Sequence, residues 1–510
     1  MTKLKKSNLF YMFSLLFLLS CRQPVSGINE VPKIVSGKVR LTGNIKSASG
    51  VNKDGMFVKI VVPHQISGDY VKYRADVDIS GNFSVDAEVE TNISFVHLST
   101  SLNPRKSLLV KLRTGYDTHI EITYNSSFDI DKIKVTPEMT QNDVTHSFDL
   151  VGKMIQYPIL KQEPLYDRST DDFLKSSKST LSEILRVVED DRLITSEMKE
   201  VLLNDFRLYY YHAAVFNYGN AMRANYFRSN GDKNKKPVIK KIDRSYYRFL
   251  KDLKLADPKY LYAFGSFWEF NRKILENEVL AIPRIDDVDI STWLTNVKRT
   301  LSDLVGFNDG LFYDILAANN YGKQLNVELK PLSEKQKENI LKYWGNGEIA
   351  KILFRKNQQI IELDKFKTPI VINDVSNIAA NKIIENITSK HKGKVILIDL
   401  WATWCGPCLD AIKHFRSTKA EFHDKDVVFV YLTNSSSPLK LWKENINAIG
   451  NEHYYLDNAQ WEYVMNSFDF EAIPSYLLFN KKGVLANKFT AFPENDEVKE
   501  MLNNLLKEKY

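Results

Sequence analysis

Two cysteines separated by two residues, Cys405 and Cys408, have the spacing most typical of chemistry in this 510-residue chain. The chain has one other cysteine, Cys21, near its start. A thiolate attacks a disulfide to form a mixed disulfide, which a second nearby thiol then resolves. The Cys-x-x-Cys pair therefore indicates thiol–disulfide exchange.

Other uses of the pair fit the sequence less well. A structural zinc site needs four ligands, and the chain has no second cysteine pair, so we predict no metal and no cofactor. A structural disulfide across two residues closes a loop too small to restrict the unfolded chain much. A peroxidase with a Thr-x-x-Cys nucleophile remains an alternative, although Thr403 precedes Cys405 by only two residues.

The elements that would position the cysteines are a strand and a helix. The segment "GKVILIDLWA" (393–402) predicts a buried strand, and "CGPCLDAIKHFRSTKAEF" (405–422) predicts a helix that begins at the cysteines. The free N–H groups and the dipole of a helix N-terminus stabilise a Cys405 thiolate. Gly406 and Pro407 set the turn and the helix start, where proline is well tolerated.

Further strands and helices follow in alternation. We expect a strand over 426–434, a hairpin within 474–492 that turns at Lys482-Gly483, and an amphipathic helix over 496–507. After the segment "FKTPIVIND" (366–374), the helical pattern of the preceding region gives way to these alternating strands and helices. This order of elements around Cys-x-x-Cys is typical of a thioredoxin fold.

The motif "WATWCGPC" (401–408), with Asp399 two residues before it and Ile473-Pro474 roughly seventy residues later, resembles the TlpA/ResA-like thioredoxins. The resemblance covers residues 365–510 and implies an α/β thioredoxin fold and a thiol–disulfide oxidoreductase. The Gly-Pro dipeptide matches reducing members of the family rather than strong oxidants. A protein disulfide reductase is therefore the expected activity.

The resemblance also implies roles for individual residues. Cys405 would be the exposed nucleophile and Cys408 the resolving thiol. Pro474 would be a cis-proline packed against Cys405, and Asp399 a buried carboxylate that takes the proton of Cys408, with a pKa raised by burial. The residues expected to contact substrate are Trp404, Gly406, Pro407 and Ile473.

The helix after the cysteines departs from the family pattern. Relatives often carry an acidic residue three positions after the second cysteine and a proline two positions later. This chain has Ala411 and Lys413 there, and Asp410 lies one residue early. Specificity for cytochrome maturation therefore does not follow from the resemblance.

The N-terminus predicts a bacterial lipoprotein. Residues 1–20 contain basic residues followed by an apolar run too short to span a bilayer, and Leu18-Leu19-Ser20-Cys21 resembles a lipobox. Lipidation of Cys21 would anchor the protein to a membrane, with residues 21–35 as a tether. An ordinary secretory signal is the alternative. Because Arg22 is not an inner-membrane retention signal, we favour the outer membrane, facing the periplasm.

The rest of the chain predicts two further domains, which makes the protein multidomain. Alternating apolar residues and turn signals over 36–130 predict an all-β sandwich. Residues 140–364 show helical spacing and predict a central α-helical domain, with Ser169 and Thr170 as a cap signal; an α-solenoid is an alternative. An aromatic cluster between Tyr209 and Phe227 predicts core packing rather than a binding face.

The charge and the domain order restrict the classes of partner that the sequence predicts. The formal charge of +7 is small for this length and argues against nucleic-acid binding. The expected substrates are oxidised exported proteins, and a membrane electron donor would re-reduce the dithiol. A lipoprotein that binds or scaffolds a partner, with a regulatory or vestigial redox domain, is the rival hypothesis, because most of the chain lies outside 365–510.

Overall fold

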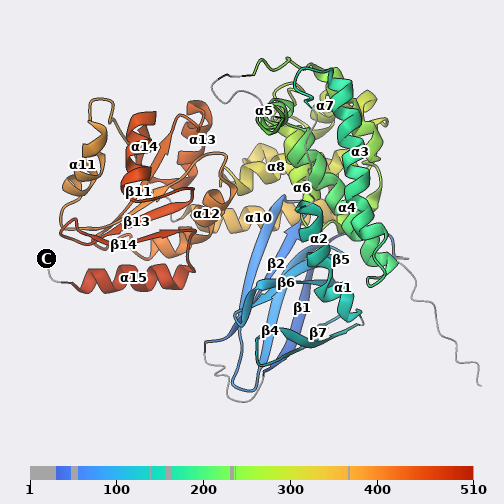
Figure 1. The fold of residues 1–510 in the computed structure, drawn as a ribbon, viewed down its shortest axis with the longest axis horizontal. Helices are drawn as coiled ribbons and strands as arrows, with labels where there is room; N and C mark the ends of the chain where they lie inside the picture. Colours follow the sequence, from blue (N-terminus) through green and yellow to red (C-terminus); the bar gives the residue numbers. More distant parts are fainter. Residues whose placement is uncertain are drawn as a thin grey trace, which may run out of the picture.

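The structure is a computed structural model that describes residues 30–47, 55–137, 139–156, 164–229, 235, 237–365 and 368–508. The predicted signal peptide, Cys21 and most of the predicted tether lie outside the described residues. Among the helices that are described, none combines the length and the apolar character that crossing a membrane requires. Figure 1 shows three parts: strands at the N-terminus, helices in the middle and an α/β part at the C-terminus.

The N-terminal part consists of two four-stranded sheets. One has the order β4-β1-β7-β8 and the other β3-β2-β5-β6. Alternate residues are buried along β4, as expected for strands that cover a core on one face. The strands are β1 (Ile34–Lys46), β2 (Phe57–His64), β3 (Asp69–Asp76), β4 (Asn82–Thr91), β5 (Ile93–Thr100), β6 (Asn103–Arg113), β7 (Thr118–Tyr124) and β8 (Ile130–Thr136). The last strand extends past residue 130, where the sequence pattern placed the end of this domain.

The middle part is helical. Ser169 caps its longest helix through a capping box with Asp172. Its elements are α1 (Gln141–Thr145), α2 (Ser147–Ile155), α3 (Thr170–Glu189), α4 (Ser196–Tyr210), the π-helix η1 (Tyr211–Val215), α5 (Tyr218–Arg228), the 3₁₀ helices η2 (Arg244–Leu253) and η3 (Pro258–Tyr262), α6 (Ser266–Leu275), α7 (Ile290–Val305), α8 (Leu311–Asn326), α9 (Glu334–Trp344) and α10 (Glu348–Asp364).

Two helical segments, η1 and η2, depart from regular α-helical geometry. The π-helix η1 follows α4 directly, and the Asn217 side chain then caps α5. The segment η2 is a 3₁₀ helix because its buried residues repeat every third position, as Tyr247, Leu250 and Leu253 show. The aromatic cluster packs mostly in the core.

The C-terminal part is a six-stranded sheet with the order β14-β13-β10-β11-β12-β9. Residues of α12, α13 and α15 share one apolar cluster with the sheet, and residues of α11 and α14 share another. The helices therefore cover both faces of the sheet. The elements are β9 (Ile370–Asn373), the 3₁₀ turn η4 (Ala380–Lys382), α11 (Ile383–Lys390), β10 (Val395–Leu400), α12 (Gly406–Ala420), β11 (Val427–Asn434), α13 (Leu439–Ile449), β12 (Asn451–Leu456), α14 (Asn458–Ser467), β13 (Ser475–Phe479), β14 (Leu485–Thr490) and α15 (Asn495–Lys507).

This topology is a thioredoxin-like fold. The strand β9 was not expected from the sequence, because four residues with an irregular burial pattern give no clear period. It pairs in parallel with β12 and forms one edge of the sheet.

The loop between β2 and β3 joins the sandwich to the helical part. Asn319 of α8 donates hydrogen bonds to the carbonyls of Gln65 and Ile66, at 2.9 and 2.8 Å. Gly322, one turn further along α8, lies directly against Ser67. The loop therefore packs against α8 through its backbone, which leaves no room for a side chain at the contact.

Because of this contact, we expect Gly→Ala at residue 322 to change the stability in the opposite direction from Gly→Ala at Gly152, a helical glycine without such a contact. A Cβ at residue 322 would lie 2.0 Å from the carbonyl oxygen of Ser67. We expect Gly322→Ala to lower the free energy of unfolding by about 2 kcal/mol or more. At Gly152 of α2 a Cβ meets nothing within 4 Å, so Gly152→Ala should raise it by about 0.5–1 kcal/mol. Urea unfolding followed by circular dichroism measures both. Wild-type stability of Gly322→Ala would contradict the packing of this loop on α8.

Candidate redox site

The two cysteines lie at the N-terminus of α12 and form a disulfide, with their Cα atoms 5.3 Å apart. Cys405 is the N-cap residue, and the N–H of Cys408 points at its sulfur at 3.3 Å. Pro407 stands in the first turn, where its missing N–H has no helical partner to lose. The helix N-terminus therefore supplies the positive end of the dipole to Cys405, as the sequence predicted.

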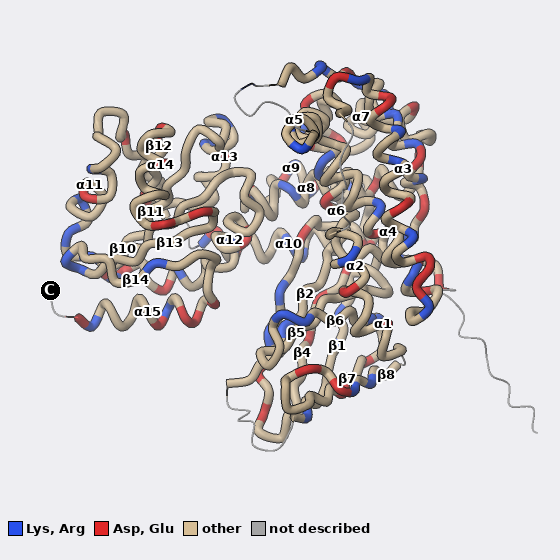
Figure 2. The backbone as a smooth tube through the Cα atoms, viewed as in Figure 1, with Lys and Arg blue, Asp and Glu red and all other residues tan. Residues whose placement is uncertain are grey.

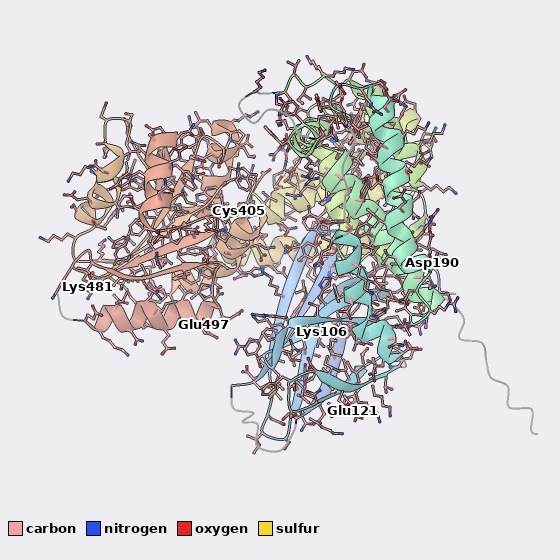
Figure 3. The ribbon with its side chains drawn as sticks, viewed as in Figure 1. Lys106, Glu121, Asp190, Cys405, Lys481 and Glu497 are labelled. Atoms are coloured by element: carbon pink, nitrogen blue, oxygen red, sulfur yellow. A yellow bond between two sulfur atoms is a disulfide. The ribbon has the colours of Figure 1, made fainter. Side chains whose placement is uncertain are left out.

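The expectation that Cys405 is exposed is wrong for this disulfide state. The residue is 3% exposed and Cys408 is fully buried. The neighbouring Trp404, Gly406 and Pro407 are exposed instead. They form an accessible rim around a sulfur that is nearly covered. Figure 3 places Cys405 on the side of the thioredoxin-like domain that faces the helical domain.

The Ile473–Pro474 peptide bond is cis. Ser475, the next residue, pairs with Leu400 at the end of β10. Pro474 therefore lies just beyond the β10–β13 ladder, at the end of β10 from which the chain runs through Trp401 to Cys405. This placement brings the predicted cis-proline and the disulfide to the same end of these two strands.

Asp399 is buried in the middle of the sheet. It stands in β10 between Tyr431 of β11 and Tyr476 of β13. Its Oδ1 atom has no hydrogen-bond partner among the described residues. Burial raises the pKa of Asp399 well above its ordinary value, and the charge of Lys419 offsets only part of this effect. The carboxyl group therefore holds a proton more readily than an exposed carboxyl group does.

A small cavity lies beside this carboxyl group. Its volume is about 10 Å³, close to the space that one water molecule needs. The cavity is lined by Asp399, by Ala411 and Ile412 of α12, and by aromatic side chains that include Tyr431 and Tyr476. The carboxyl group and residues of α12, the helix that carries Cys408, thus line the same small cavity.

Lys419 is a site residue that the sequence analysis missed. Its Nζ atom donates to the carbonyl of Ile449 at 2.7 Å and to the hydroxyl of Tyr431 at 3.4 Å. Burial, together with the nearby charge of Arg416, lowers the pKa of Lys419 to about 7. A signal was present, because Lys419 continues the buried spacing of Cys408, Ile412 and Phe415 along α12.

The described residues contain no group of three or more His, Cys, Asp or Glu side chains that could hold a metal ion. His212, within the aromatic cluster, lies on the π-helix of the helical domain, where burial lowers its pKa to about 4. The chemistry of the described site therefore rests on the dithiol and the buried acid and base beneath it.

Known proteins resemble this part of the chain. Residues 371–505 match the Redoxin family. A thioredoxin from Coprinus comatus is 36% identical over 52 residues, which are 9% of this chain and 49% of the relative. Thioredoxin Y2 of Arabidopsis thaliana chloroplasts is 28% identical over 117 residues, 23% of this chain and 54% of the relative. The chain thus spans about half the length of these curated relatives.

Solved structures give similar matches. StoA from Bacillus subtilis shares 22% identity, with 21% of this chain and 82% of that chain covered and a TM-score of 0.19. A thiol:disulfide interchange protein of the thioredoxin family from Chlorobium tepidum shares 16% identity, with 23% and 84% covered and a TM-score of 0.21. Residues 371–505 thus match the Redoxin family model and have a thioredoxin-like topology.

The buried carboxyl group gives a prediction about pH. Because folding favours protonated Asp399, its ionisation destabilises the protein as pH rises above the ordinary carboxyl pKa. We expect Asp399→Asn to increase the free energy of unfolding at pH 7 on the order of 2 kcal/mol, and this gain should vanish below about pH 4. Thermal unfolding of both proteins from acid to neutral pH tests the sign. Stopped-flow kinetics should show release of the mixed disulfide slowed by about tenfold or more. If the free energies of unfolding of the two proteins depend on pH in the same way, the raised pKa of Asp399 is contradicted.

Proposed function

We propose that the protein is a thiol–disulfide oxidoreductase of the cell envelope that reduces disulfides of exported proteins. The observation that carries the proposal is the Cys405–Cys408 disulfide at the N-terminus of α12, at the end of β10 where cis-Pro474 also lies, in the same domain as the buried Asp399. Each of these groups has a part in exchange chemistry.

The reaction starts from the reduced dithiol. The Cys405 thiolate attacks one sulfur of a client disulfide, breaks the client S–S bond and releases the first client sulfur as a thiolate. Cys408 then loses its proton to Asp399 and attacks the Cys405 sulfur. This step forms the Cys405–Cys408 bond and releases the second client sulfur. Two electrons pass from the protein to the client, and the disulfide seen in the structure is the oxidised product.

We assign client recognition to the exposed residues around Cys405. Trp404, Gly406 and Pro407 are exposed around Cys405, and the Trp404 indole N–H donates to Ser436 at 3.1 Å, which fixes the ring. The backbone of Ile473 lies just beyond the β10–β13 ladder. An extended client segment that pairs with this backbone would bring its disulfide to Cys405.

The envelope location rests on the N-terminal sequence. A lipid on Cys21 would hold the domains at the periplasmic face of the outer membrane, and a membrane electron donor would reduce the disulfide after each turnover. Reduction is favoured over oxidation by the Gly-Pro dipeptide between the cysteines.

The division of labour between the cysteines can be tested by trapping. Without Cys408 the mixed disulfide cannot be resolved, so Cys408→Ala should accumulate covalent adducts that reductant dissolves. Cys405→Ala should form almost none, because Cys408 is fully buried within the helix. Non-reducing electrophoresis and mass spectrometry of envelope extracts show the adducts and identify the clients. Equal trapping by both variants would contradict the roles, and no trapping by either would favour the binding or scaffold function.

The anchor can be tested separately. Replacing Cys21 with Ala removes the only thiol in the lipobox-like segment, so the variant should lose its lipid and its tight membrane association. Fractionation of cells, with immunoblotting of the soluble and membrane fractions, measures the change. Ser20→Ala, which leaves the thiol in place, is the matched control and should stay in the membrane. Membrane retention of Cys21→Ala would exclude lipid anchoring through this residue.

A further inference from the structure

The outer face of the redox helix α12 is partly covered by other parts of the chain. Asp410, Lys413, His414 and Ser417 are spaced so that they lie on one face of the helix. This face is opposite the buried one that carries Cys408. Lys413, His414 and Ser417 line a cleft of about 530 Å³, whose other walls come from β1, β3, β4 and α10. The redox helix therefore meets both of the other domains.

Asp69, the first residue of β3, is the centre of this contact. Lys356 of α10 and Lys413 of α12 both donate to its Oδ2 atom. The N–H of Tyr70 donates to its Oδ1 atom at 2.9 Å. The three charged side chains are between 8% and 14% exposed. One carboxylate thus joins the sandwich, the helical domain and the redox helix, and both of its oxygens are hydrogen-bonded.

Each buried charge in this cluster depends on its partners. Burial alone would raise the pKa of Asp69, but Lys356 and Lys413 together lower it below its usual range. Burial lowers the pKa of Lys413 to about 8, against the opposing effect of Asp69. Removal of Asp69 would leave two buried cations without their shared anion, which is strongly unfavourable. Removal of the Lys413 charge would leave Asp69 and Lys356 as a balanced pair.

Two other contacts between the C-terminal part and the sandwich are more exposed. Lys72 of β3 pairs with Asp410, and Lys59 of β2 pairs with Glu494 next to α15. These side chains are all more than 30% exposed, so water and salt screen the pairs and they contribute little. The orientation of α12 relative to the sandwich therefore depends chiefly on the buried Asp69 cluster.

We propose that Asp69 is a positioning residue that, through Lys413 and Lys356, fixes the redox helix against the other two domains and so limits the directions from which a protein client reaches Cys405. The inference rests on the proposed function. Cys405 is 3% exposed and faces the helical domain (Figure 3). A bulky client must approach past that domain, whereas a small disulfide does not.

Two variants and two substrates test this proposal. Reduced protein, freed of reductant, is mixed with insulin as a protein disulfide or with 4,4′-dithiodipyridine as a small one. Lys413→Met should raise the second-order rate constant for insulin about threefold or more, because the approach is less restricted. The rate with the small disulfide should stay unchanged. Asp69→Asn should also raise the rate constant for insulin and leave that for the small disulfide unchanged. Asp76→Asn, on the same strand with a side chain 83% exposed, is the matched control and should behave as wild type.

Hydrogen exchange provides a readout that does not depend on catalysis. Amides of β3 and of the C-terminal half of α12 should exchange faster in Lys413→Met and Asp69→Asn, with those of β7 and β8 unchanged. An insulin rate that is unchanged or lower, or parallel changes for both substrates, would overturn the proposal. Unchanged exchange in β3 and α12 would also overturn it. If the wild type reduces neither substrate, the proposed function fails and the inference about clients fails with it.

Discussion

The redox helix α12 has to satisfy two packing surfaces at once, and this constraint governs the C-terminal domain. Its inner face, with Cys408, Ile412 and Phe415, closes over the sheet. Its outer face meets the sandwich through Lys413. Only the N-terminal end of the helix remains at the rim, and Cys405 occupies that end. A cysteine at a helix N-terminus is thus combined with a helix body that is held from both sides.

The two buried carboxyl groups near this helix differ in how completely their oxygens are hydrogen-bonded. This difference suits one to fixing geometry and the other to exchanging a proton. Asp69 accepts hydrogen bonds at both oxygens and has two cations beside it, so its ionised form is stabilised. Asp399 has an oxygen without a partner among the described residues, and burial favours its protonated form. A fully paired carboxylate fixes geometry, whereas an incompletely paired one can gain and lose a proton. The packing of the chain has produced one of each on opposite faces of α12.

The local part of the site could be predicted from the sequence, and the long-range part could not. The strand and helix around Cys405, the buried position of Asp399 and the cis bond before Pro474 depend on neighbours in a short motif or on a known pattern. The contact of Lys413 with Asp69 joins residues 344 positions apart, and no spacing rule relates them. Lys413 differed from the family pattern, but only the fold shows what it meets. The coverage of Cys405 likewise depends on tertiary packing.

The position of Asp69 is itself set by the helical domain. The loop that leads into β3 is held at Gln65 and Ile66 by Asn319, and at Ser67 and Gly68 by Asn326, both from α8. Glu90 of β4 accepts from the N–H groups of Ile66 and Ser67, at 2.7 and 3.0 Å. Because most backbone groups in this loop have a hydrogen-bond partner, Asp69 has little freedom to follow a displaced α12. The redox helix must therefore adjust to the sandwich and the helical domain, rather than the reverse. This asymmetry gives the large non-catalytic part of the chain a physical role in how the dithiol is presented.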